Sequence, residues 1–119
     1  MATMKRYNVF EPKITNTGRN TKTEWINPVI FKGIMFPATS DTQVQIYGKE
    51  LKNIMTLVIK GKYQQEIVDK HILYKFKKFN ICEGYGIGDK DSTTAFYNVI
   101  SIKAYKNILI CDCEVWNGR

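Results

Sequence analysis

The clearest pattern along the chain is an alternation of apolar and acidic residues close to the C-terminus. The apolar positions are Leu109, Cys111, Cys113 and Val115, and the acidic positions between them are Asp112 and Glu114. Successive side chains of a strand point to opposite faces, so one face is apolar and the far half of the other face is acidic. Residues 108–115 therefore predict a half-buried antiparallel strand, paired with a strand at 96–103 through a connection at 104–107.

Shorter apolar segments predict the other strands. We expect these strands at residues 5–11, 23–37, 53–59 and 71–81. Pro12 ends the first strand or holds it at a sheet edge, because proline donates no hydrogen bond to a ladder. The segment 23–37 is apolar on both faces, which indicates a central strand or one curved by bulges near Pro28 and Gly33.

The region between residues 38 and 52 allows two interpretations. Residues 43–47 alternate as a short strand would, whereas Asp41 could begin a helix that Gly48 interrupts. We expect a short irregular element here rather than a regular strand or helix.

Three polar segments predict loops. Residues 13–22 have no apolar period and carry Gly18 at their centre, so they predict a long exposed loop, which in a small domain is often functional. Residues 63–69 lead into a turn at Asp69 and Lys70. Residues 83–94 carry three glycines and several small polar residues, which are typical of loops.

These elements predict a single all-β domain over residues 1–119. About six or seven short strands, long loops and at most one short helix suit a small antiparallel β-barrel or sandwich. The composition, with 44% apolar and 24% charged residues, is that of a globular protein.

The formal net charge of +7 changes the picture by indicating an anionic neighbour. That neighbour would be nucleic acid, an acidic protein or a membrane surface, although the same charge also serves solubility. The N-terminal residues lack the apolar core of a signal peptide, and no run approaches the roughly 18 apolar residues that span a bilayer. We therefore expect synthesis in the cytosol and no membrane partner.

The cysteines and the other reactive residues do not form a recognisable catalytic pattern. The three cysteines are Cys82, Cys111 and Cys113, an odd number that fits a disulfide framework poorly and favours buried free thiols over half of a zinc site.

The sequence GYGIG at residues 84–88 lacks the spacing of a dinucleotide-binding loop, so it predicts a flexible turn. Asp89 and Asp91 have no third carboxylate at a spacing suited to a metal, and His71 has no evident catalytic partner. We expect no enzyme, no catalytic residue, no metal and no cofactor.

Cationic residues occur in two segments that could contact a polyanion. Arg19 and Lys22 lie in the predicted loop at 13–22. The second segment interleaves cations with aromatic residues, and its members are Tyr74, Lys75, Phe76, Lys77, Lys78 and Phe79. Such a segment can grip a nucleic-acid backbone and stack bases, or it can be a solvated face whose aromatic side chains turn inward.

Three segments together resemble a known family. The N-terminal YNVFEPKITNTGRNTKTEW, the central QIYGKELKNIMTLVIKG and the final YNVISIKAYKNILICDCEV resemble the head-closure (head–tail connector) proteins of tailed phages, a group often described as minor capsid proteins in phages of Gram-positive bacteria. The resemblance is one of layout over most of the chain. The segment 83–94 is longer than the family pattern implies.

The resemblance implies a β-barrel protomer that assembles as a homo-oligomeric ring below the portal or its adaptor. A cyclic ring of roughly twelve or six copies would form the neck of the virion, contact the portal or adaptor and the tail-terminator protein, and help to retain packaged double-stranded DNA without reading its sequence. It also implies assembly in the cytoplasm of a host bacterium, residence in the virion and no enzymatic activity.

Within that hypothesis, individual residues receive expected roles. Arg19 and Lys22 would face DNA in the channel, and Lys75, Lys77 and Lys78 are further candidates for that role. We expect the side chain of Trp25 to lie in the core and Trp116 to make a terminal contact, with either able to anchor an interface.

Two alternatives remain open from the sequence. The chain could form a different ring of the same particle, the tail terminator. It could also be a small single-stranded nucleic-acid-binding barrel that uses Tyr74, Phe76 and Phe79 as stacking platforms.

Overall fold

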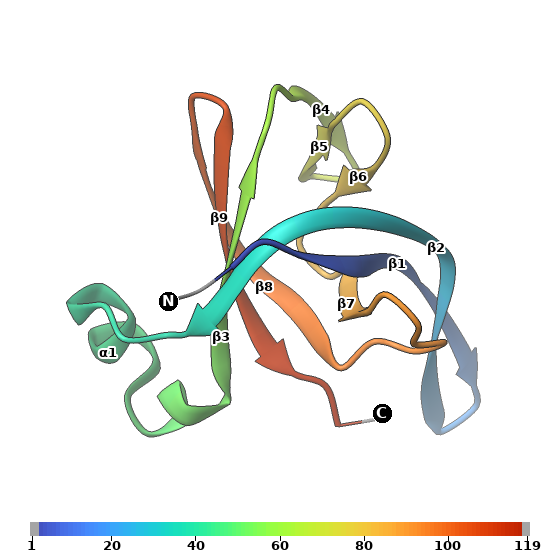
Figure 1. Cartoon of the computed structure of the whole chain (residues 1–119). Coiled ribbons are helices and arrows are strands. Elements are labelled where there is room, and N and C mark those ends of the chain that lie inside the picture. The colour runs from blue at the N-terminus through green and yellow to red at the C-terminus, as the bar shows by residue number, and fades with distance from the viewer. Residues whose placement is uncertain (1–2, 118–119) are drawn as a thin grey trace.

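The computed structural model describes residues 3–117 and is built mostly of antiparallel strands. The expected all-β fold with one short α-helix is confirmed. Six strands close into a barrel in the order β1-β2-β3-β9-β8-β7, and three short strands form a second sheet in the order β4-β5-β6 (Figure 1). Of the two architectures predicted, the larger sheet is therefore the barrel.

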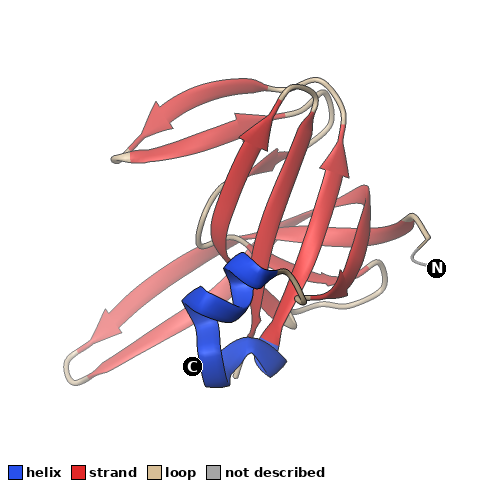
Figure 2. Ribbon diagram, turned by 90° about the vertical axis from the view of Figure 1, so that its left-hand side faces the viewer, coloured by secondary structure: helices blue, strands red, loops and turns tan. Residues whose placement is uncertain are grey.

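The barrel strands are β1 (Lys5–Thr17), β2 (Asn20–Pro37), β3 (Ile54–Lys60), β7 (Gly86–Asp89), β8 (Tyr97–Tyr105) and β9 (Ile108–Val115). The second sheet contains β4 (Gln64–Val68), β5 (His71–Lys75) and β6 (Asn80–Ile81). Helix α1 (Asp41–Tyr47) and the 3-10 helix η1 (Gly48–Asn53) connect β2 to β3 and lie against the barrel wall (Figure 2).

The predicted C-terminal hairpin is confirmed, and its apolar face fills the barrel. Leu109, Cys111 and Cys113 are fully buried in the central apolar cluster, while Val115 at the end of the strand is partly exposed. All three cysteines of the chain are buried free thiols. Burial raises the pKa of the Cys111 thiol to about 12, because a thiolate would lose its hydration there.

Asp112 lies on the face of β9 opposite the apolar residues, as predicted, but the expected exposure of that face is wrong here, because Asp112 is only 5% exposed. The side-chain amide of Gln43 donates a 2.7 Å hydrogen bond to one of its carboxylate oxygens, and the Tyr47 hydroxyl donates a 2.7 Å bond to the other. Gln43 also donates to the Thr56 hydroxyl at 2.8 Å. Helix α1 therefore covers this part of β9, and Asp112 attaches the helix to the barrel.

Helix α1 itself corrects the expected irregular element at 38–52 in favour of the helical alternative. Ser40 accepts a hydrogen bond from the Gln43 backbone N–H, and the Gln43 side chain accepts one from the Ser40 backbone, which together form a capping box. Gly48 ends the helix with a φ of +51°.

The predicted exposed loop at 13–22 is wrong, because these residues form the end of a long β1–β2 hairpin. Backbone pairing continues from Pro12 opposite Trp25 to Thr17 opposite Asn20, and only Gly18 and Arg19 turn the chain. The part beyond Pro12 extends away from the barrel as a two-stranded arm (Figure 2). Strand β7 pairs with β1 only over residues 7–10, so Pro12 does lie at a free edge.

The predicted curvature of the second strand is confirmed at one of its two expected positions. The register between β1 and β2 shifts around Asn27 and Pro28, where Asn27 takes a φ of +54°. Gly33 instead keeps the regular register, opposite Lys5. The bulge at Asn27 and Pro28 separates the arm from the barrel part of β2.

The second sheet also differs from expectation. The turn at Asp69 and Lys70 is confirmed, with φ values of +49° and +69°, but the preceding polar segment is strand β4 rather than a loop. The predicted strand 71–81 divides into β5 and β6, because the chain reverses between Phe76 and Phe79, whose backbone groups share a 2.8 Å hydrogen bond.

The glycine-rich segment 83–94 contains barrel strand β7, so it is not entirely the flexible loop expected. A Cβ at Gly86 would lie 2.5 Å from that of Ala95 and 2.8 Å from the Trp25 ring. Gly88 is similarly close to Ser92 and Thr94. Glycine is needed here because neighbouring groups fill the space of a side chain.

Candidate anionic-ligand groove

The predicted cationic residues lie in two places, one on the arm and one beside the second sheet. Arg19 lies in the turn of the arm, and Lys22 lies close to it on β2, 3.9 Å from the Glu24 carboxylate in an exposed ion pair. Lys75, Lys77 and Lys78 lie on β5 and the turn that follows it. The arm tip and the β5–β6 turn lie at opposite ends of the molecule, the arm tip low and the turn high in both views (Figures 1 and 2).

The second place borders a groove of about 700 Å³ between the β5–β6 turn and the outer surface of the barrel. Its cationic lining residues are Arg6, Lys32, Lys62, Lys77 and Lys78. Its apolar lining residues are Ile30, Phe31, Phe76 and Phe79. An apolar floor beneath a cationic rim is suited to an anionic ligand that also carries an apolar group.

The aromatic floor is a stack of three phenylalanine rings. The Phe76 and Phe79 rings are 4.7 Å apart and nearly parallel, at 3°. Phe79 also stacks on Phe31, with ring centroids 4.9 Å apart and an angle of 26° between the planes. On the far side, Tyr63 is tilted onto Phe76 at 5.5 Å. The stack joins the second sheet to β2 of the barrel.

This arrangement weighs against the three predicted stacking platforms. Tyr74 is only 6% exposed and packs edge-on against Tyr63 at 5.6 Å. Phe76 and Phe79 cover each other's faces, and Phe31 covers the second face of Phe79. Sequence-independent binding of single strands depends on open aromatic faces, and here these faces are largely occupied.

Lys75 lies apart from the groove and faces a neighbouring hollow with Lys62 and Tyr63. Its ammonium group is 3.2 Å from the Glu66 carboxylate on the paired strand β4. Both side chains are exposed, so this ion pair contributes little to stability. Of the three lysines in the predicted cationic segment, Lys77 and Lys78 therefore belong to the groove.

Three cations of the groove were not singled out from the sequence. Arg6 and Lys32 are directly opposite each other in the β1–β2 ladder, and Lys62 follows β3. The strand register and the chain reversal at the β5–β6 turn place these three cations beside the same groove as Lys77. The only indication in the sequence that these cations could share a site is that Arg6 and Lys32 lie within apolar segments. The pairing of those two strands could not be predicted from the sequence.

The two tryptophans contact each other near the base of the arm. The Trp25 and Trp116 rings meet edge to face, with centroids 5.1 Å apart and planes at 80°. Both are partly buried, and the Trp25 ring packs against Gly86. The backbone N–H of Trp116 donates a 2.8 Å hydrogen bond to the Phe96 carbonyl. Trp25 was expected in the core and is only partly buried. The terminal contact expected of Trp116 is made with the ring of Trp25.

The side chains considered for chemistry do not come together. His71 begins β5 as predicted and is exposed. Asp89 ends β7 opposite Tyr7 of β1, and Asp91 lies in the turn that follows. Within residues 3–117, no three histidine, cysteine or acidic side chains are placed to hold a metal ion. Within the same residues, no helix is both long and apolar enough to cross a membrane.

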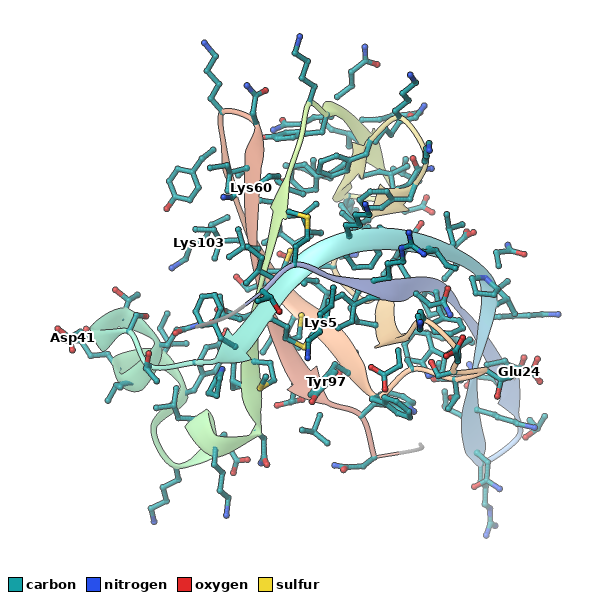
Figure 3. The ribbon with its side chains drawn as sticks, viewed as in Figure 1. Lys5, Glu24, Asp41, Lys60, Tyr97 and Lys103 are labelled. Atoms are coloured by element: carbon teal, nitrogen blue, oxygen red, sulfur yellow. The ribbon has the colours of Figure 1, made fainter. Side chains whose placement is uncertain are left out.

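Figure 3 places several charged side chains relative to these features: Glu24 lies on the arm, Asp41 at the helix, and Lys60 and Lys103 on β3 and β8, the two strands that flank β9. Comparisons with protein-family models, with curated proteins and with solved structures give no match to this chain.

Proposed function

We propose that this chain is a structural protein of the head–tail junction of a tailed phage, where copies form a ring below the portal or adaptor. The ring closes the head, helps to retain packaged DNA and receives the tail. The resemblance of the sequence to head-closure proteins is the starting point, and an all-β barrel is the protomer that it implies.

The observation that carries the proposal is the β1–β2 arm. Among residues 3–117, the arm beyond Pro12 pairs only with itself and both of its outer edges are free. Ile14 exposes an apolar side chain on it. An isolated two-stranded ribbon is only marginally stable in water, and free edges invite pairing with another chain. Within a ring, each arm would extend over a neighbouring copy or into the channel.

The charges of the arm suit a position beside DNA. Arg19 lies at its tip and Lys22 close to it. Within residues 3–117 Arg19 has no ion pair, and that of Lys22 with Glu24 is long, at 3.9 Å, and exposed. Cations at the tip would attract phosphates without reading bases. Packaged double-stranded DNA is therefore the proposed neighbour of the arm tip.

A tail-terminator ring is the alternative within the same particle, and the neighbouring protein distinguishes the two. A head-closure ring binds the portal or adaptor, whereas a tail terminator binds the end of the tail tube. The single-stranded nucleic-acid-binding alternative has less support, because the rings proposed as stacking platforms are buried or covered.

The test is a shortened arm in which Asn-Gly replaces residues 14–23. Lys13 and Glu24 are opposite each other in the ladder, four positions from Thr17 and Asn20, which flank the natural two-residue turn. Because pair types alternate along an antiparallel ladder, Lys13 and Glu24 form the same type of pair, and a two-residue turn can join them without disturbing the barrel. We expect the free energy of unfolding to change by less than about 1 kcal/mol. In a phage that depends on this chain, we expect DNA-filled heads that leak or remain without tails.

The matched control keeps the arm at full length and replaces Arg19 and Lys22 by alanine. If the arm acts through its charges, this control also leaks DNA; if it acts through contacts with a neighbour, only the shortened arm fails. A normal yield of infectious particles from the shortened arm would remove it from the mechanism.

A further inference from the structure

We propose that the groove between the β5–β6 turn and β2 is a docking site for an acidic segment of a partner protein, which inserts one apolar side chain between its cations. The proposal goes beyond the ring function and does not depend on it. It is based on the charge, the floor and the rigidity of the groove.

The charge of the groove is one-sided. Its five cations have no acidic residue among the groove's lining residues. Within residues 3–117, the ion pairs of the chain are those of Lys22 and Lys75, and none includes a cation of this groove. Arg6 also borders a hollow that contains Asp89 and Asp91, and Lys77 and Lys78 border one that contains Glu11. Lys32 and Lys62 therefore carry the argument most directly.

The pairing of Arg6 with Lys32 strengthens this point. The two residues are directly opposite in the antiparallel ladder, where like charges are unfavourable for folding. An acidic ligand would relieve that repulsion. The folded chain thus holds an unfavourable arrangement of charge that binding would make favourable.

The aromatic floor of the groove favours a ligand with a carboxylate beside an apolar group over a stacked nucleic-acid base. Both faces of Phe79 are covered, so this ring presents its edge to the groove. The edge of an aromatic ring carries partial positive charge and attracts anions, whereas base stacking needs a ring face. Beside it, Ile30 is 53% exposed and offers an apolar contact.

The site is rigid before any ligand binds. The hydrogen bond between the backbones of Phe76 and Phe79 fixes the turn, and the stack on Phe31 fixes the turn to the barrel. A preformed site loses less conformational entropy on binding, so a short segment can bind it. The volume of about 700 Å³ is within the range of natural ligand sites and accommodates a large side chain with its flanking residues.

The test is a fluorescence anisotropy titration with a labelled peptide that has one phenylalanine between two acidic triplets. Three probes serve as comparison: the same peptide with serine for phenylalanine, the same peptide with lysine for each acid, and a labelled thymidine oligonucleotide of equal charge. We expect the acidic phenylalanine peptide to bind about tenfold more tightly than any of the three.

Two pairs of variants locate the site. Lys77→Glu with Lys78→Glu should weaken binding of the acidic peptide by about tenfold or more, whereas Lys49→Glu with Lys52→Glu on η1 makes the same change in net charge and should leave it within about twofold. Ile30→Ser should weaken binding, and Ile67→Ser, at a residue that is 80% exposed on β4, should not. All six positions are exposed, so the barrel should remain folded.

Several results would overturn the proposal. Equal weakening by the two lysine pairs would show unspecific attraction, and no loss from Ile30→Ser would remove the apolar contact. Tighter binding of the oligonucleotide, lost in the Lys77 and Lys78 variant, would make the groove a nucleic-acid site. Self-association that the same variant abolishes would make the occupant a second copy.

Discussion

At the scale of residues, the buried carboxylate of Asp112 is the contact that best explains why α1 lies where it does. Its two oxygens accept hydrogen bonds from Gln43 and Tyr47, and no cation balances its charge among the hydrogen bonds and ion pairs of the described residues. Burial and this hydrogen bond raise the pKa of Tyr47 well above its ordinary value. The helix is therefore attached through a small polar cluster beside the apolar core.

Replacement of Asp112 by alanine should lower the free energy of unfolding by about 2 kcal/mol, because two hydrogen bonds to the carboxylate are lost and the buried Gln43 amide keeps only its bond to Thr56. Glu114→Ala is the matched control on the same face of β9, and it should change stability by less than about 0.5 kcal/mol. Denaturant unfolding measures both. Equal losses from the two variants would contradict the role of Asp112.

The buried thiols predict how stability depends on pH. In the unfolded chain a cysteine loses its proton near pH 9, whereas burial raises the pKa of Cys111 to about 12 and that of Cys113 well above its ordinary value. Between these limits the folded state holds more protons than the unfolded state. The free energy of unfolding should therefore fall as pH rises above 9, by about 1.4 kcal/mol per pH unit for each thiol.

Substitution of Cys111 and Cys113 by valine removes these two groups and should make the decline between pH 9 and pH 12 shallower. Unfolding measured in denaturant at a series of pH values shows the difference in slope. An unchanged slope in the double variant would mean that other groups cause the decline.

At the scale of elements, strands with one buried face could be predicted from the sequence and strands exposed on both faces could not. β9 alternates because Leu109, Cys111 and Cys113 fill the barrel, and its position and inward face were predicted correctly. The arm and β4 have no buried face, so their residues show no apolar period and appear as loops. Backbone hydrogen bonds hold the arm and β4 as strands, and such bonds have little effect on the pattern of residue types.

The groove shows the same limit for a site. Lys77 and Lys78 were recognised as candidates because they are adjacent to aromatic residues in the sequence. Arg6, Lys32 and Lys62 join them only through the register of β1 with β2 and the position of the second sheet. In the same way, the alternation of β9 predicts the outward position of Asp112 correctly, but not its burial, because the helix that covers it comes from another segment of the chain.

At the scale of the whole molecule, the β1–β2 arm and the second sheet extend from the barrel toward opposite ends of the molecule (Figures 1 and 2). The β1–β2 arm carries Arg19 and Lys22 at its tip, and the second sheet carries the groove. The two proposals assign these cations to different ligands, the arm tip to DNA and the groove to an acidic protein segment.

The proposed ring is tested most directly by a cryo-electron microscopy reconstruction of the neck in particles of a tailed phage in which this chain is produced. The account predicts a closed ring of copies of this barrel below the portal or adaptor, with each β1–β2 arm over a neighbouring copy or in the channel. Particles that contain no copy of the barrel, or that hold it only at the far end of the tail, would contradict it.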